Sequence, residues 1–125
     1  MFIIILNLMK NDFVHLHLHS QYSLLDGAIK FDELFDEVAR QGMSAVALTD
    51  HGNLFGAYDF YKLGKKNNIK PIIGCEVYIT KDRTKKTPEN NKTHHLTVLC
   101  MNIKGYENLC SLVSTGHLEG FYRKP

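Results

Sequence analysis

The chain lacks an excess of charge of one sign, a disulfide framework and a long hydrophobic run. Its 15 Lys and Arg face 13 Asp and Glu among 125 residues, a formal net charge of +2, so no overall field draws it to nucleic acid or a membrane. Its three cysteines, Cys75, Cys100 and Cys110, are an odd number without a CxxC pair. This pattern indicates a reducing compartment and predicts a cytoplasmic protein.

The apolar run over residues 1–6 is too short to cross a membrane, which takes about 20 such residues. It has no basic segment before it and no small-residue cleavage site after it, and the polar residues 10–12 follow, so it does not match a signal peptide. We interpret residues 1–11 as an N-terminal extension, either an extra strand or the product of an upstream start codon, with residues 12–125 as the domain. We favour the second explanation, because Met9 would make a natural start.

Hydrophobic periodicity predicts alternating strands and helices. Residues 13–19 alternate as in a strand, with His15, His17 and His19 on one face. Apolar residues at helical spacing from Phe31 predict an amphipathic helix that ends at Gly42. The remaining predictions are a buried strand over 45–49, a helix over 54–66, a strand over 71–79, a polar surface loop over 81–92, a strand over 95–101 and a helix over 105–114 with Tyr106, Leu109, Leu112 and Val113 facing inward.

Strands that alternate with helices imply parallel pairing and right-handed crossovers, hence an α/β sheet or barrel. Four strands are too few to close a barrel, and the last residues, 122–125, contain neither a helix cap nor a closing strand. We therefore expect the front portion of a larger α/β barrel. We also expect the isolated piece to fold poorly, because a half barrel leaves strand edges unpaired.

Side chains that bind metal ions occur at every predicted strand end, where the loops of an α/β barrel carry its chemistry. Imidazole and carboxylate are ligands of zinc, manganese and iron. His17 and His19 are about 6.5–7 Å apart on a strand and can share one ion or bind two neighbouring ions. His15 lies about 13 Å from His19, which is too far to share that ion, so we expect it in the core or behind the ligands. The candidates are His17, His19, Asp26 in the following loop, Asp50, His51, Glu76, His94 and His95.

Each pattern also has a plainer interpretation. Two histidines in an HxH strand are often merely half exposed, and an Asp-His-Gly turn commonly places an Asp at a helix cap. The lysine-rich loop over 81–92 is more simply explained by solvation than by phosphate binding. The coincidence of metal-binding side chains at all the strand ends favours a functional site.

Three motifs resemble those of the PHP (polymerase and histidinol phosphatase) domain family. The first comprises residues 13–20 (FVHLHLHS) and 22–27 (YSLLDG), the second residues 48–54 (LTDHGNL) and the third residues 74–76 (GCE). The resemblance covers residues 12–125. One branch, the N-terminal PHP domain of the bacterial DNA polymerase III alpha subunit, is further indicated by NLFGA (53–57), IKPIIG (69–74), HLT (95–97), GYENL (105–109) and EGFY (119–122).

The resemblance implies a distorted (β/α)7 barrel with up to three divalent ions, and phosphoesterase or 3′-5′ exonuclease chemistry in the complete domain. Glu76 and Asp26 would be its catalytic carboxylates. The family's remaining ligands, among them a late Asp-x-His, would lie beyond Pro125. DNA and other replicative polymerase subunits are the implied partners, and polymerisation itself would need another domain. Carried over by position, the metal ligands are His17, His19, Asp26, His51, Glu76 and His95, with His94 as the alternative if the register shifts by one.

Two other functions remain open from the sequence. A free-standing phosphatase of the histidinol-phosphatase type would be favoured by lysines or arginines that converge on the rim of the pocket. A non-catalytic PHP domain would use metal, if any, for folding or for docking a partner subunit.

Overall fold

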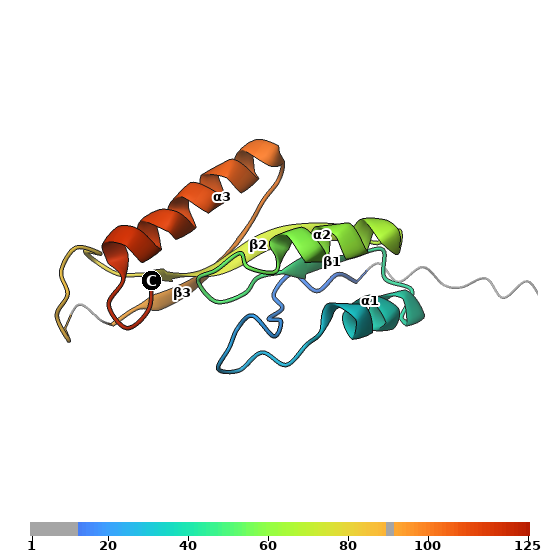
Figure 1. Cartoon of the computed structure of the whole chain (residues 1–125), viewed down its shortest axis with the longest axis horizontal. Coiled ribbons are helices and arrows are strands. Elements are labelled where there is room, and N and C mark those ends of the chain that lie inside the picture. Colours follow the sequence, from blue (N-terminus) through green and yellow to red (C-terminus); the bar gives the residue numbers. More distant parts are fainter. Residues whose placement is uncertain (1–12, 90–91) are drawn as a thin grey trace, which may run out of the picture.

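The computed structural model describes residues 13–89 and 92–125, so the expected extension over residues 1–11 lies outside the described residues. In the described part of the chain, no helix combines the length and the apolar character needed to cross a membrane. Figure 1 shows α1 and α2 beside β1, with α3 farther along the sheet over β2 and β3. The elements in chain order are α1 (Phe31–Arg40), β1 (Ala45–Leu48), α2 (Ala57–Lys66), β2 (Lys70–Ile79), β3 (His94–Leu99), α3 (Ile103–Thr115) and a π-helical turn (Gly116–Gly120).

The three strands form one sheet in the order β1-β2-β3. β1 and β2 pair in parallel from Ala45 opposite Lys70 to Leu48 opposite Ile73, as predicted for strands joined by a helix. β3 pairs with β2 antiparallel, from Gly74 opposite Leu99, so the expected parallel pairing is wrong for this strand. The cause is the connection: the chain between β2 and β3 contains no helix in its described part, and a parallel partner needs a crossover.

Residues 13–19 do not form the regular strand that their alternation predicts. The segment instead runs along the free edge of β1, where Ala47 N–H donates to the His15 carbonyl (2.9 Å) and Thr49 N–H to the Leu18 carbonyl (2.8 Å). The Thr49 hydroxyl accepts from Leu18 N–H at 2.8 Å and takes the place of a main-chain partner. The main-chain ladder is therefore interrupted at its end. The predicted two-faced pattern also fails in part, because Leu18 is buried and Leu16 is exposed.

The hydrophobic core lies between α1, α2 and β1. α1 buries Phe31, Leu34, Phe35 and Val38 at the predicted spacing, and the Phe35 ring packs against that of Phe60 in α2 with centroids 5.1 Å apart. All four residues of β1 are buried, as expected for a strand covered on both faces. This packed layer fixes the strand end that follows Leu48, where the candidate site begins.

The helices begin and end close to the predicted positions, with two informative differences. α2 starts three residues after residue 54, because the Asn53 side-chain oxygen accepts from Phe55 N–H and holds a turn there. α3 starts after Asn102, whose side chain accepts from Gly105 N–H at 2.9 Å, a standard N-cap bond. Of the predicted inward residues of α3, only Leu109 is buried, and Leu112 is 51% exposed. A cavity between α3 and the β2–β3 hairpin, described below, replaces the expected close packing.

Candidate metal centre

Glu76 lies at the centre of the site because main-chain bonds join β2 to the residues that follow β1. Glu76 N–H donates to the Asp50 carbonyl at 3.0 Å, and Gly52 N–H donates to the Glu76 carbonyl at 2.9 Å. His51 and Glu76 are paired as an isolated parallel bridge. The Glu76 side chain is only 3% exposed. The parallel pairing thus continues past β1 and places His51 beside a buried carboxylate.

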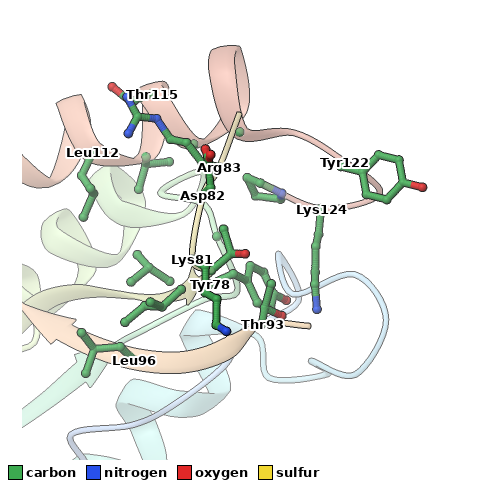
Figure 2. Close-up of a pocket in the computed structure, with 18 of the residues that line it drawn as sticks. Tyr78, Lys81, Asp82, Arg83, Thr93, Leu96, Leu112, Thr115, Tyr122 and Lys124 are labelled. Carbon is green, nitrogen blue, oxygen red and sulfur yellow. The ribbon is translucent and has the colours of Figure 1, made fainter. Parts of the chain in front are cut away.

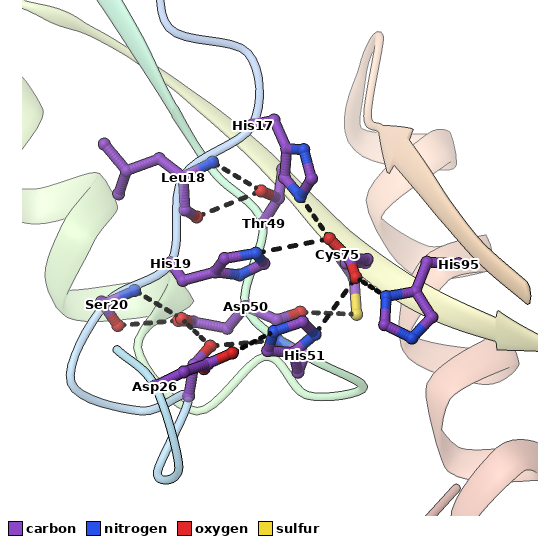
Figure 3. A network of polar contacts seen from close by, with 12 residues as sticks. His17, Leu18, His19, Ser20, Asp26, Thr49, Asp50, His51, Cys75 and His95 are labelled. Carbon is purple, nitrogen blue, oxygen red and sulfur yellow. Dashed lines mark hydrogen bonds and ion pairs between the residues drawn. The ribbon is translucent and has the colours of Figure 1, made fainter. Parts of the chain in front are cut away.

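Four imidazole rings converge on the Glu76 carboxylate, two on each oxygen (Figure 3). Nε2 of His17 contacts Oε2, and Nε2 of His19 lies 3.3 Å from the same oxygen. On the other side, Nδ1 of His95 contacts Oε1, and Nδ1 of His51 lies 3.2 Å from it. These five residues come from segments up to 78 positions apart (17 to 95 in the sequence). Such convergence is the arrangement that the strand-end pattern predicts.

The donor atoms form two groups that share Glu76. His17, His19 and Glu76 make one group, and His51, Glu76 and His95 the other, with the donor atoms of each within 4.8 Å of one another. Asp26 stands behind the second group, where its Oδ2 lies 3.1 Å from Nε2 of His51. All six predicted site residues are therefore connected, five directly through Glu76 and Asp26 through His51.

The other two histidines of the predicted strands lie apart from these groups. His94 is exposed and lines a separate hollow with Glu89 and Lys92, so β3 presents His95, not His94, to Glu76. His15 is exposed, with its ring edge-on to Phe13. The core position, one of the two expected for His15, is therefore wrong.

Tyr78 is a part of the site that the sequence analysis missed. Its ring stacks on His51 with centroids 6.1 Å apart and meets the His95 ring edge-on at 4.8 Å. One signal could have identified it, because Tyr78 lies two residues from Glu76 on β2 and hence on the same face. Its pairing with His95 depends on the antiparallel ladder, which the sequence did not predict. On the other side of His51, His19 stacks at 4.0 Å.

The protonation states of the cluster suit metal binding. Burial alone would raise the pKa of Glu76, but the hydrogen bond from His17 and the charges of His51, His17 and His95 together lower it below its ordinary value. The pKa of His19 is lowered, first by burial and then by the nearby His51. At neutral pH these residues therefore present an ionised carboxylate and an imidazole lone pair, which are the forms that bind a metal ion.

The cluster leaves two buried ring nitrogens without a hydrogen bond. Nδ1 of His19 and Nδ1 of His51 have no hydrogen-bond partner, although the latter lies close to Glu76 Oε1. A buried polar atom without a partner costs free energy. A divalent cation between His51, Glu76 and His95 would satisfy Nδ1 of His51, because a metal ion accepts lone pairs from imidazoles and from a carboxylate at once. The residues present therefore fit a metal ion.

Asp50 holds the loop that carries Asp26. This role differs from the two predicted for it, which were a metal ligand at the strand end and a helix cap. Its carboxylate is 1% exposed and accepts from Ser20 N–H (2.6 Å), the Ser20 hydroxyl (2.8 Å) and the Ser23 hydroxyl (2.7 Å). The Ser23 oxygen in turn accepts from His51 N–H at 3.1 Å. One buried carboxylate thus links the loop before Asp26 to the main chain of His51.

We expect Asp50→Asn to weaken divalent-metal binding about 10–100-fold, the usual effect of changing a residue that orients metal ligands. The amide nitrogen cannot accept from Ser20, so a buried hydroxyl loses its partner at a cost of about 1–3 kcal/mol in stability. Metal affinity by competition with a chelating dye, together with the melting temperature in chelator, measures both effects. Asp36→Asn on the exposed face of α1 is the control; equal metal affinity in the two variants would contradict this role.

Comparison with known proteins places residues 15–125 in one family. The sequence model of the PHP domain family matches residues 15–125. The DNA polymerase III subunit alpha of Aquifex aeolicus is 53% identical over 125 residues, covering 94% of this chain and 11% of that protein. The chain thus spans about a tenth of the length of the curated relatives that it matches.

Solved structures with a similar fold include two hydrolase-type proteins. A putative metal-dependent phosphoesterase from Bifidobacterium adolescentis has a TM-score of 0.55 at 17% identity, covering 82% of this chain and 31% of that one. An amidohydrolase from Chromobacterium violaceum, with bound sulfate and no metal, has a TM-score of 0.55 at 26% identity, covering 85% and 34%. These similarities confirm the predicted fold class, a mixed α/β arrangement that corresponds to part of a barrel.

Proposed function

The chain belongs to the PHP domain family, and from this membership we propose that it contributes a metal-dependent phosphoesterase centre to the N-terminal region of a replicative DNA polymerase. We assign residues 12–125 to the N-terminal part of that domain. The observation that carries the proposal is the convergence of His17, His19, His51 and His95 on the buried Glu76 carboxylate. Well-packed apolar residues often stabilise a protein as well as a buried ionic group does, so this cluster is better explained by a functional role.

We propose that the two groups around Glu76 hold two neighbouring divalent ions, zinc, manganese or iron, with up to three ions in the complete domain. His17, His19 and Glu76 would hold one, and His51, Glu76 and His95 the other. Such ions would supply Lewis-acid chemistry, stabilising charge on a phosphoryl oxygen and activating a water molecule for attack.

The remaining chemistry falls to the residues of the chain. Glu76 bridges the two groups and fixes their separation through its burial and its β2 position. Asp26 is 59% exposed at the edge of the cluster and can accept a proton from an attacking water. Tyr78 covers one side of His51 and meets the edge of His95.

The substrate that we propose is the 3′ end of DNA, cleaved in the 3′-5′ direction. This proposal rests on the relatives named DNA polymerase III subunit alpha. The partners that it implies are DNA and the other polymerase holoenzyme subunits, and the compartment is the cytoplasm. Nucleotidyl transfer would belong to a separate domain. A phosphatase acting on a small phosphomonoester is the second candidate, and the basic residues Lys81 and Lys124 beside the site favour it.

The test is hydrolysis of defined substrates after metal is removed with chelator and then restored. We expect manganese or zinc to restore release of single nucleotides from a primer with a mismatched 3′ end, and to give less release from a small phosphomonoester. Faster cleavage of the phosphomonoester would support the second candidate. Metal-loaded protein that hydrolyses neither substrate would contradict the catalytic proposal and leave a structural or docking role.

A further inference from the structure

A cavity of about 540 Å³ adjoins the metal centre, between the β2–β3 hairpin on one side and α3 with its following turn on the other (Figure 2). This volume lies within the range of small-molecule sites, about 300–1,000 Å³. Its inner surface is apolar and comes from both elements. The side chains that form this surface, which we name the apolar floor, are Val77, Leu96 and Val98 of the hairpin and Leu112 and Val113 of α3.

The rim of the cavity is positively charged. Lys81, Arg83, Lys85 and Lys124 line it, against Asp82 as its acidic member. Arg83 is paired with Glu119 at 2.7 Å, whereas neither Lys81 nor Lys124 forms an ion pair with a carboxylate of the described residues. Two lysines are therefore available to an anion above a floor that would suit a flat, apolar group.

Tyr78 lies between the cavity and the metal centre, whereas the floor residues Val77, Leu96 and Val98 lie on the opposite face of the two strands from Glu76. The Tyr78 side chain lines the cavity, and its ring also stacks on His51 and meets the edge of His95. The Lys124 ammonium lies over the same ring, 4.5 Å from its centroid, within the range of a cation–π contact. A phosphate bound by Lys124 would therefore lie one tyrosine ring away from the residues around Glu76.

Gly52 forms part of the wall between the cavity and the metal centre. It follows His51, lines the cavity and has a φ of +59°, a conformation that favours glycine. A Cβ at this position would meet the Pro125 ring at 2.7 Å and the Tyr78 ring at 3.4 Å. The chain thus brings the cavity wall against the metal centre with no space for another side chain.

We propose that the cavity is a nucleotide subsite, in which Lys81 and Lys124 bind phosphate oxygens and the base lies on the apolar floor. The inference rests on the proposed function and deepens it, because it names the part of the substrate that the chain recognises beside the metal centre. The ligand that we propose for this subsite is a nucleoside monophosphate unit. That unit can be the end of a DNA strand or a free mononucleotide, and the experiment separates these two sources.

The Tyr78 hydroxyl adds a donor to this subsite. The Tyr78 ring lies beneath the Lys124 ammonium, and its hydroxyl can donate a proton in a hydrogen bond. A phosphate oxygen can accept that proton in a hydrogen bond, in addition to the charged contacts of the lysines.

The experiment titrates metal-free protein, kept in chelator, with deoxyadenosine monophosphate and separately with inorganic phosphate. We expect the nucleotide to bind more tightly than phosphate, because only the nucleotide reaches the floor. Lys124→Ala should weaken both ligands about tenfold or more, the loss expected for one charge-assisted bond. Lys81→Ala should act in the same direction, whereas Leu96→Ala should weaken the nucleotide and leave inorganic phosphate unchanged.

Lys66→Ala is the matched control, since Lys66 lies on the exposed last turn of α2 away from the cavity. Equal binding by Lys124→Ala and Lys66→Ala, or equal affinity for nucleotide and phosphate, would overturn the subsite. A short single-stranded oligonucleotide that displaces the nucleotide at a lower concentration identifies the strand end as the source. An oligonucleotide that displaces it only at a higher concentration identifies the free mononucleotide.

Metal content measured on the same variants separates this inference from the proposed function. Lys124→Ala should retain the metal content of the unaltered protein. Lysine-dependent nucleotide binding in a protein that retains no metal would uphold the subsite and contradict the metal centre. Normal metal content without nucleotide binding would uphold the metal centre and contradict the subsite.

Discussion

Replacing Glu76 with glutamine should leave a folded protein that no longer retains divalent metal. Glu76 belongs to both groups of donor atoms, so one substitution removes a charged ligand from each. The neutral amide offers one weak oxygen and no negative charge to offset two cations. We therefore expect a loss of affinity beyond the roughly 100-fold that a change behind the ligands produces, together with the loss of all metal-dependent hydrolysis.

Elemental analysis after dialysis against a weak chelator measures this effect. Stability in chelator should change much less than metal content, because the main-chain bonds of Glu76 to Asp50 and Gly52 do not involve its side chain. Glu33→Gln, on the exposed first turn of α1, is the control for the change of charge. A Glu76→Gln protein with the metal content of this control would show that Glu76 is not a ligand.

Substituting His17 and His51 together with alanine should also abolish metal uptake. The pair removes one imidazole from each group, and it leaves each with a single histidine and the shared carboxylate. Two protein ligands are fewer than the three that catalytic zinc sites keep. We expect no metal to remain after dialysis, and nucleotide release from primed DNA to fall to the level of the chelated protein.

The chain supplies a closely matched control for this double variant. His15 shares the segment of His17, and His94 adjoins His95, yet both are exposed and lie outside the two groups. His15→Ala combined with His94→Ala removes the same number of imidazoles and should keep full metal content. Unchanged stoichiometry in the His17 and His51 variant would mean that the assigned ligands are wrong.

The sequence predicted the packed parts of the fold because their signals are local. Phe31, Leu34, Phe35 and Val38 recur at helical spacing, and the helix α1 that they form has Gly42 with φ +71° just beyond its end. The direction of β3 was beyond such reasoning, since it depends on whether the chain after β2 crosses over or turns back. Residues 13–19 mislead for a related reason: alternation shows which residues could share a face, not whether a ladder forms.

The candidate site was more predictable than the sheet around it. HxH spacing, the strand-end Asp-His pair and the isolated Glu76 identify residues whose chemistry has few other uses, and the structure brings them together. Asp50 was predicted only as a strand-end candidate or a helix cap, and Tyr78 was not a candidate, because a carboxylate and an aromatic ring have many roles in any sequence. Only the pairing of Tyr78 with His95 and the bonds from Ser20 and Ser23 to Asp50 reveal those roles.

Anomalous X-ray scattering from crystals of the metal-loaded protein, recorded on both sides of the absorption edge of the metal, tests the metal centre most directly. The account predicts two neighbouring peaks, one bounded by His17, His19 and Glu76 and the other by His51, Glu76 and His95. A fully loaded protein whose anomalous peaks lie away from Glu76 would contradict it.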